Sequence, residues 1–297
     1  MIIETRSLTK KFWRHDAVRG LSLAVPEGAV CALVGANGAG KTTLMRMLVN
    51  ILKPDSGSAQ VLGVDSRHLA PADFLRIGYV SENQELPDRL SVAHYFDYLR
   101  ALYPGWDAAF ERELRAGFEL PPARPLGKLS RGTRMKVKIA GALSFRPKLL
   151  ILDEPLSGLD PLVRDEVMSG MLSQAGETTI LISSHEIAEI EGGTTHVAFM
   201  VRGRLLLQEP VESLCARYRD VNVTLEAPAM DQSLPPSWMN VHREGPMVSF
   251  TETAFVDDRA LRELVEARLG RCHYLEASAM SLLEISKATM RATREAE

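Results

Sequence analysis

The feature that most constrains the fold of this chain is a stretch of eight residues, residues 35–42. It reads GANGAGKT and fits the pattern G-x-x-x-x-G-K-[ST]. An apolar run at residues 30–34 precedes it, and apolar side chains at helical spacing follow it over residues 44–52. A strand, a glycine loop and a helix in this order are the setting in which such a loop wraps around phosphate groups. The sequence therefore predicts a nucleotide-binding site, because a plain glycine-rich turn would not need both flanking elements.

The residue types in this loop indicate how it would hold a nucleotide. Gly35, Gly38 and Gly40 allow the backbone to turn tightly, so that successive N–H groups and the helix N-terminus face the phosphates. Lys41 would supply positive charge to the β- and γ-phosphates, and the Thr42 hydroxyl a ligand for Mg²⁺. We expect the nucleotide to contact Gly35, Ala36, Asn37, Gly38, Ala39, Gly40, Lys41, Thr42 and Thr43.

Two further apolar runs end in residues that could complete the site. Residues 149–152 form a predicted buried strand that ends in Asp153 and Glu154. Because ligands lie at the C-terminal ends of parallel strands, we expect Asp153 to hold Mg²⁺, directly or through water, and Glu154 to act as general base on the attacking water. A β-branched run at residues 178–182 leads to His185, which could hydrogen-bond the γ-phosphate and orient that water. Taken singly, these residues are also compatible with an ordinary strand end and a surface histidine.

The order of these motifs resembles that of the ATP-binding cassette (ABC) ATPases. The chain carries GANGAGKT as the Walker A loop, LSRGT at residues 129–133 as the signature, LLILDE as Walker B, SGLD as the D-loop and His185 as the switch histidine. The similarity covers about residues 1–215. It implies an ATPase that binds ATP and Mg²⁺ and whose sites form between two such domains facing head to tail. Ser130 and Gly132 would then contact the γ-phosphate held by the partner's Walker A loop.

The signature allows a simpler interpretation and departs from the family pattern. From its residues alone, LSRGT is compatible with a plain N-cap, in which Ser130 caps a helix over about residues 134–145. Arg131 stands where the family has its second glycine, and Thr133 where it has glutamine. The serine and the glycine nearest the phosphate are kept, so the resemblance still implies a working site.

Two other site residues rest on the resemblance alone. Phe12 occupies the place where the family stacks an aromatic ring on adenine, with Trp13 as the competing residue. Glu82 aligns with the usual Gln of the Q-loop, and a carboxylate there is a reasonable ligand for Mg²⁺. Gln84 is the alternative for the Q-loop role.

The predicted fold class is α/β, a P-loop NTPase of the ABC ATPase type with a helical insertion and a small C-terminal α+β appendage. We assign residues 1–218 to the nucleotide-binding domain, with the insertion at about residues 86–145, and residues 219–297 to an accessory domain. In the accessory domain, two segments alternate like strands and one reads as a helix, at residues 221–227, 247–254 and 257–269. Its last segment, SLLEISKATM, looks like the tail of cassette subunits from two-component exporters.

Charge, cysteine spacing and the length of apolar runs exclude several classes of function. The net charge of −3 argues against a protein that grips nucleic-acid backbone, and three widely spaced cysteines argue against a zinc site. No apolar run approaches the ~20 residues of a membrane span. The resemblance therefore implies the ATPase subunit of an ABC transporter, most simply a homodimer. It would be cytoplasmic and peripheral on the inner face of the membrane, attached only through a separate permease, which it would power for export. The alternative is a soluble cassette ATPase that acts as an assembly factor on a protein scaffold.

Overall fold

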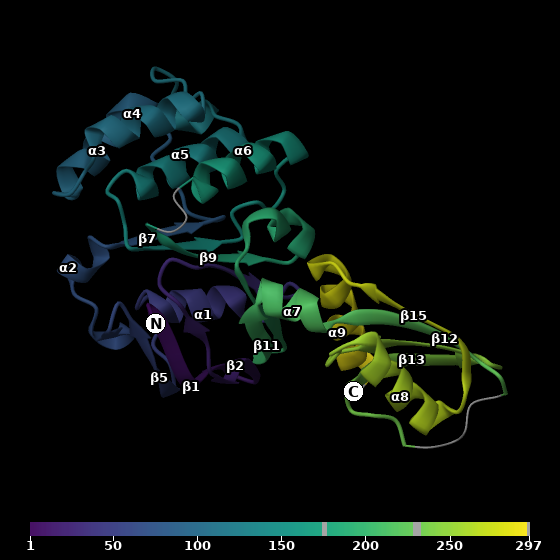
Figure 1. The fold of residues 1–297 in the computed structure, drawn as a ribbon. Coiled ribbons are helices and arrows are strands. Elements are labelled where there is room, and N and C mark those ends of the chain that lie inside the picture. The colour runs from purple at the N-terminus through teal and green to yellow at the C-terminus, as the bar shows by residue number, and fades with distance from the viewer. Residues whose placement is uncertain (174–176, 228–232, 296–297) are drawn as a thin grey trace. The chain divides into compact units, whose positions relative to one another are not determined.

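The computed structural model describes residues 1–173, 177–227 and 233–295, and it divides into two compact units (Figure 1). The units are Met1–Gln208 and Glu209–Glu297, whereas the sequence suggested a boundary after Tyr218. The boundary in the structure lies nearer the N-terminus than the sequence suggested. The reason is that helix α7 (Val211–Arg217) packs against helix α9 (Leu282–Glu295) of the second unit.

The first unit is built on a six-stranded sheet with the strand order β11-β10-β4-β9-β8-β7. Neighbouring strands from β10 to β7 run parallel. The strands that carry the motifs, β4 and β8, are buried at every residue, as expected for parallel strands covered on both faces. The bounds are β4 Val30–Val34, β7 Ile77–Ser81, β8 Leu149–Asp153, β9 Thr179–Ser184, β10 His196–Val201 and β11 Arg204–Pro210.

A second, antiparallel sheet lies in the same unit. Its strands are ordered β2-β1-β5-β6, and β3 pairs with β1. The bounds are β1 Ile3–Phe12, β2 His15–Leu21, β3 Ala24–Val25, β5 Ser56–Val61 and β6 Val64–Asp65.

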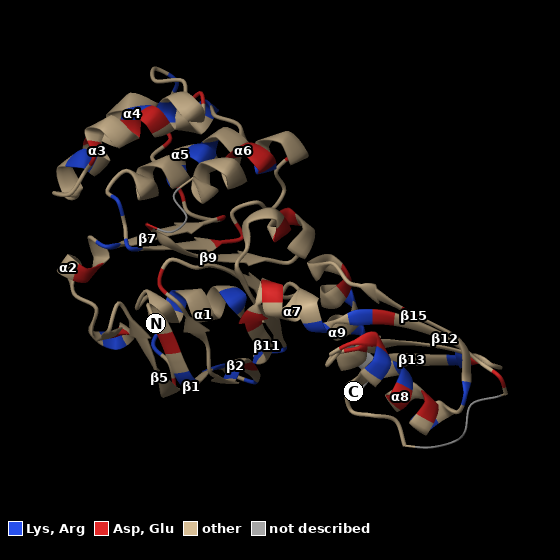
Figure 2. Cartoon of the chain, in the orientation of Figure 1, with Lys and Arg blue, Asp and Glu red and all other residues tan. Residues whose placement is uncertain are grey.

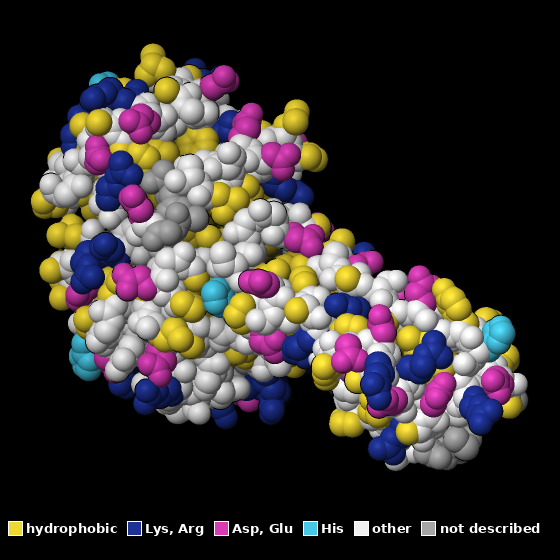
Figure 3. All heavy atoms as spheres, viewed as in Figure 1, with side chains coloured by type: hydrophobic (Ala, Val, Ile, Leu, Met, Phe, Trp, Pro, Cys, Tyr) yellow, Lys and Arg dark blue, Asp and Glu magenta, His cyan; other side chains and the backbone are white. Residues whose placement is uncertain are grey.

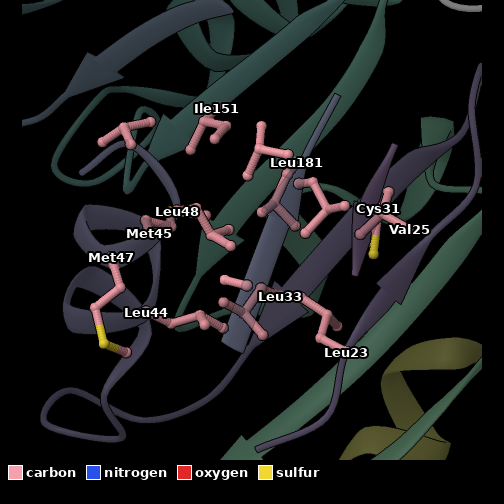
Figure 4. Close-up of a cluster of buried hydrophobic side chains, with 14 of the residues drawn as sticks. Leu23, Val25, Cys31, Leu33, Leu44, Met45, Met47, Leu48, Ile151 and Leu181 are labelled. Atoms are coloured by element: carbon pink, nitrogen blue, oxygen red, sulfur yellow. The ribbon is translucent and has the colours of Figure 1, made fainter. Parts of the chain in front are cut away.

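The core of the first unit gathers around helix α1, Lys41–Leu48. Figure 4 shows side chains of α1 meeting side chains from the two sheets, and the residues that it labels are Leu23, Val25, Cys31, Leu33, Leu44, Met45, Met47, Leu48, Ile151 and Leu181. Burial raises the pKa of the Cys31 thiol to about 12, so this cysteine behaves as a small apolar residue. The core holds α1, and with it the end of the phosphate loop, against the sheet.

Residues 86–145 contain the helices that the sequence predicted. Helices α3 to α5, together with α6, gather on one side of the six-stranded sheet (Figure 1). The expected start of α5 near residue 134 is wrong: the helix begins at Arg131, because the Ser130 side chain caps it by accepting a hydrogen bond from Thr133 N. The bounds are α2 Pro71–Phe74, α3 Val92–Leu102, α4 Ala108–Gly117, α5 Arg131–Leu143 and α6 Pro161–Leu172, with 3-10 turns η1 Ser66–His68, η2 Leu126–Lys128, η3 Ile187–Glu189 and η4 Glu191–Gly193.

The second unit has a four-stranded antiparallel sheet with the order β13-β14-β12-β15. The elements expected from the sequence are present as β12 (Arg219–Leu225), β14 (Met247–Glu252) and α8 (Asp258–Leu269). The sequence did not reveal the two edge strands, β13 (Trp238–Glu244) and β15 (Cys272–Ala279). Part of the proline-rich stretch expected between strands, residues 228–232, lies outside the described residues. A separate apolar cluster forms between this sheet and α8.

Charged side chains of both signs are interspersed over the surface. Figure 2 shows Lys and Arg alternating with Asp and Glu along α4 and α8, and Figure 3 shows charges of both signs on the face in view. Within the described parts of the chain, no helix combines the length and the apolar character that crossing a bilayer would need.

Candidate nucleotide-binding site

The phosphate loop joins the end of β4 to the start of α1. Gly40, the N-cap of α1, has a φ of 104°, and a Cβ on it would lie 2.1 Å from the carbonyl oxygen of Ala17. A Cβ on Gly35 would lie 2.2 Å from the carbonyl oxygen of Met200. Glycine is therefore required at both positions by close backbone contacts, and at Gly40 by its left-handed conformation as well.

A cavity of about 360 Å³ opens over this loop. Its lining consists of Phe12, His15, Ala17, Asn37, Gly38, Ala39, Gly40, Lys41, Thr42, Thr43, Glu82 and Glu154. Gly35 and Ala36, two further expected contacts, accept hydrogen bonds from Lys41 Nζ through their carbonyl oxygens, at 2.5 and 3.3 Å. His15 is a lining residue that the sequence did not single out. A larger cavity, of about 670 Å³, lies between α4 and α6.

The hydroxyl of Thr42, a residue of the cavity lining, contacts the carboxylate of Asp153. Thr42 Oγ1 donates to Asp153 Oδ1 at 2.9 Å, and Ser183 Oγ donates to the same oxygen at 3.1 Å. Burial raises the pKa of Asp153, although these two hydrogen bonds oppose the shift. A buried carboxylate beside a hydroxyl offers the hard oxygen ligands that Mg²⁺ prefers, so the residues present fit this metal. Ser183 was missed because a serine at the end of an apolar strand carries no local signal of its own.

Glu154 lies between Lys41 and His185. Its Oε1 is 2.9 Å from Lys41 Nζ, and its Oε2 is 3.0 Å from His185 Nδ1. The hydrogen bond with Glu154 is the main reason why the pKa of His185 is raised. Because β8 and β9 are parallel neighbours, their C-terminal ends bring Glu154 and His185 together as the sequence suggested.

Glu82 and the signature residues lie apart from this cluster. The Glu82 side chain lines the cavity, but its carboxylate forms an ion pair with Arg131. Among the residues that the structure describes, the lining includes neither Ser130 nor Gly132. Ser130 is the N-cap of α5, so the simpler interpretation of LSRGT correctly describes its local role.

The candidate adenine contact is at the rim of the cavity. Phe12 lines it and is 44% exposed, which leaves a ring face available for stacking. Trp13 is 99% exposed and stands clear of the protein surface. Between the two, Phe12 has the position that suits a base over the phosphate loop.

Comparisons with known proteins identify the family of the chain. The family model described as ABC transporter matches residues 18–157. The chain is 30% identical over 246 residues to the ABC transporter ATP-binding protein YtrB of Bacillus subtilis, covering 78% of this chain and 84% of YtrB. It is 33% identical over 296 residues to the daunorubicin/doxorubicin resistance ATP-binding protein DrrA of Streptomyces peucetius, covering 94% of this chain and 88% of DrrA.

The fold is also that of known cassettes. A solved structure titled as the ATP-binding subunit of an ABC transporter superposes with a TM-score of 0.66 at 24% identity, over 73% of this chain and 92% of that one. Together with the P-loop architecture and the convergence of Lys41, Glu154 and His185, these matches settle the family. The chain belongs to the ABC transporter family, as an ATP-binding and ATP-hydrolysing subunit that powers a separate permease.

Proposed function

We propose that this subunit powers export by hydrolysing ATP with Mg²⁺ at sites shared between two copies of the chain. The observation that carries the proposal is the cluster of Lys41, at the start of α1, with Glu154 and His185, which follow the adjacent strands β8 and β9. The oxygens of Thr42 and Asp153 lie beside it. This arrangement supports the proposal because a cation for phosphate, two oxygen ligands for a metal and a candidate base lie close together.

Each residue has a role that its position supports. Lys41 binds the β- and γ-phosphates, while Thr42 and Asp153 would hold Mg²⁺, which neutralises charge on the phosphate oxygens when bound. Glu154 accepts the proton of the attacking water, and His185 orients Glu154 and the γ-phosphate. A phosphate group competes with Glu154 for Lys41, so nucleotide binding would release the carboxylate toward the water.

The shared site is supported by the position of the signature. Ser130 and Gly132 open α5, whose N-terminal end carries the partial positive charge that favours phosphate. The described lining of the chain's own cavity leaves both residues out, so the phosphate that they contact would belong to a second copy. A homodimer with a two-fold axis completes two equal sites.

The partners and location of this subunit follow from its relatives. DrrA is named for resistance to daunorubicin and doxorubicin, and BcrA of Bacillus licheniformis, 34% identical over 246 residues, for bacitracin transport. We propose the same kind of task here: export of an amphipathic compound through a permease that holds this subunit at the cytoplasmic face of the membrane. The interspersed charges in Figures 2 and 3 do not favour nucleic acid as a partner.

Replacing Glu154 by glutamine tests this function. Glu154→Gln keeps the shape of the side chain but removes the base, so the variant should bind ATP and hydrolyse it far more slowly, by ~10²–10⁴-fold. Because the ATP-bound dimer is then not reopened, it should accumulate as an ATP-dependent dimer in size-exclusion chromatography. Near-normal turnover by this variant would remove Glu154 from the mechanism.

A further inference from the structure

Two residues at which this chain departs from the ABC pattern form an ion pair with each other. Glu82 follows β7, and Arg131 is the first residue of α5. Nη2 of Arg131 contacts Oε1 of Glu82, although the two residues are 49 positions apart in the sequence. An isolated exposed pair contributes little, so the surroundings decide what this pair does.

Arg131 occupies a position that is unfavourable for a cation. The N-terminal end of a helix carries partial positive charge, which repels a guanidinium. The first turn of α5, all of whose residues are described, holds no acidic side chain that could offset this charge. The carboxylate of Glu82 supplies the negative charge that the first turn of α5 lacks. The guanidinium also lies over Gly158, where a Cβ would be 2.6 Å from Arg131 Nη1.

A second cation of α5, Lys138, contacts the backbone of the same residue. Lys138 lies seven positions after Arg131, which places it on the same face of the helix. Its Nζ donates to the carbonyl oxygens of Ser81 at 3.1 Å and Glu82 at 3.0 Å. Helix α5 therefore binds Glu82 through both its side chain and its backbone.

Glu82 is at the same time part of the nucleotide cavity. Its side chain contributes to the lining, and its backbone N–H donates to the carbonyl oxygen of Asp153 at 3.0 Å. Asp153 is the carboxylate expected to hold Mg²⁺. Glu82 thus contacts two parts of the molecule. One is Asp153, in the chain's own nucleotide site, and the other is the N-terminal end of α5, which is expected to face the partner's nucleotide.

We propose that Arg131 is a positioning residue, which competes with the nucleotide-bound Mg²⁺ for the carboxylate of Glu82 and so couples the two ATP sites of the dimer. The inference rests on the proposed function, because it requires a shared site. When Glu82 turns to the cation, the charge of Arg131 is no longer neutralised at the N-terminal end of α5. It then adds to the attraction for the phosphate held by the partner chain, so filling one site strengthens the contact that completes the other.

A double-mutant cycle measures this competition. The probe is adenylyl imidodiphosphate, a non-hydrolysable ATP analogue, and the readout is its binding as a function of Mg²⁺ concentration, by calorimetry. Arg131→Gln should lower the Mg²⁺ concentration needed for half-maximal binding about two- to fivefold, the range expected for an exposed pair. Glu82→Gln should raise it by a similar factor. Once Glu82→Gln is present, adding Arg131→Gln should change nothing further.

Two control variants separate competition from a structural effect. Arg134→Gln breaks another ion pair of α5, with Asp88, and should leave the Mg²⁺ midpoint unchanged. Arg131→Lys keeps the charge and should behave like the unmodified chain. A midpoint shift for Arg131→Gln that is equal with and without Glu82→Gln, or no shift at all, would overturn the inference.

A different result would contradict the proposed function itself. Lys41→Ala should weaken analogue binding at least ~10-fold if the site is the one proposed. Binding that depends on Lys41 but shows no coupling between Glu82 and Arg131 would overturn only the competition, whereas binding that is indifferent to Lys41 would overturn the site itself.

Discussion

Lys41 and Glu154 form an ion pair in the wall of the nucleotide cavity, with Lys41 Nζ 2.9 Å from Glu154 Oε1. Lys41 is only 5% exposed, so removing either partner would leave an uncompensated buried charge. The cation expected to hold phosphate and the carboxylate expected to activate water thus neutralise each other. His185 extends this pair through its hydrogen bond to Glu154.

Removing Lys41 should therefore weaken nucleotide binding and the folded protein together. We expect Lys41→Ala to reduce ATP affinity at least ~10- to 100-fold, the value of a charge-assisted hydrogen bond to phosphate. It should also lower the melting temperature, because Glu154 would be left without its cation. Lys136→Ala, which removes a cation paired with Glu166 between α5 and α6, is the matched control. Equal ATP affinity in the two variants, measured by calorimetry, would contradict the assigned role of Lys41.

The stability of the first unit should depend on pH through Lys138. Burial lowers the pKa of Lys138 to about 8, below its ordinary value of 10.5. The unfolded chain then binds more protons than the folded one between these two values. The free energy of unfolding should rise with pH from about 8 to 10.5, with a slope of up to ~1.4 kcal/mol per pH unit from this group.

The check is a comparison with Lys138→Met, which fills similar space without the charge. Chemical denaturation of both proteins at several pH values gives the difference in unfolding free energy. This difference should be constant below about pH 8, where the penalty for the buried charge is fully present. Above about pH 8, the unfolding free energy of the unmodified chain should rise relative to that of Lys138→Met. Parallel pH curves would show that Lys138 keeps its ordinary pKa.

Much of the nucleotide site could be predicted from the sequence. Strands β4 and β8 were placed correctly because each is a continuous apolar run with a clear end, at Gly35 and Asp153. The start of α5 was placed too late, because its first turn contains arginine, glycine and threonine rather than apolar residues at helical spacing. The Glu82–Arg131 pair could not be predicted, since no local pattern links residues 49 positions apart.

The edge strands of the second unit were missed for a different reason. Strands β13 and β15 lie at the two edges of the sheet, and most of their side chains are exposed or only partly buried. Edge strands commonly carry polar residues, so their sequences alternate weakly. The central strand β12 alternates between buried and exposed side chains and was predicted.

The boundary between the two units can be tested by truncation. The fragment 209–297 should fold alone, because it has its own apolar cluster, whereas 219–297 should be less stable. The shorter fragment lacks α7, which packs against α9 and contains the buried Leu214, and it lacks Arg217, which pairs with Glu209. We expect a loss of about 2–3 kcal/mol from Leu214 alone. Equal unfolding free energies of the two fragments in urea would favour a boundary after Tyr218.

The central claim, an ATP site completed by a second copy of the chain, is tested most directly by mixing two inactive variants. Lys41→Ala removes the phosphate cation, and Ser130→Arg blocks the signature, so each homodimer should be inactive. In a mixed dimer, the intact Lys41 of one chain faces the intact Ser130 of the other, which leaves one site whole. The measurement is single-turnover ATP hydrolysis by purified mixed dimers, because one whole site suffices for a single turnover. We expect hydrolysis of about one ATP per mixed dimer and none by either variant alone. Mixed dimers that form but hydrolyse no ATP would contradict the shared site.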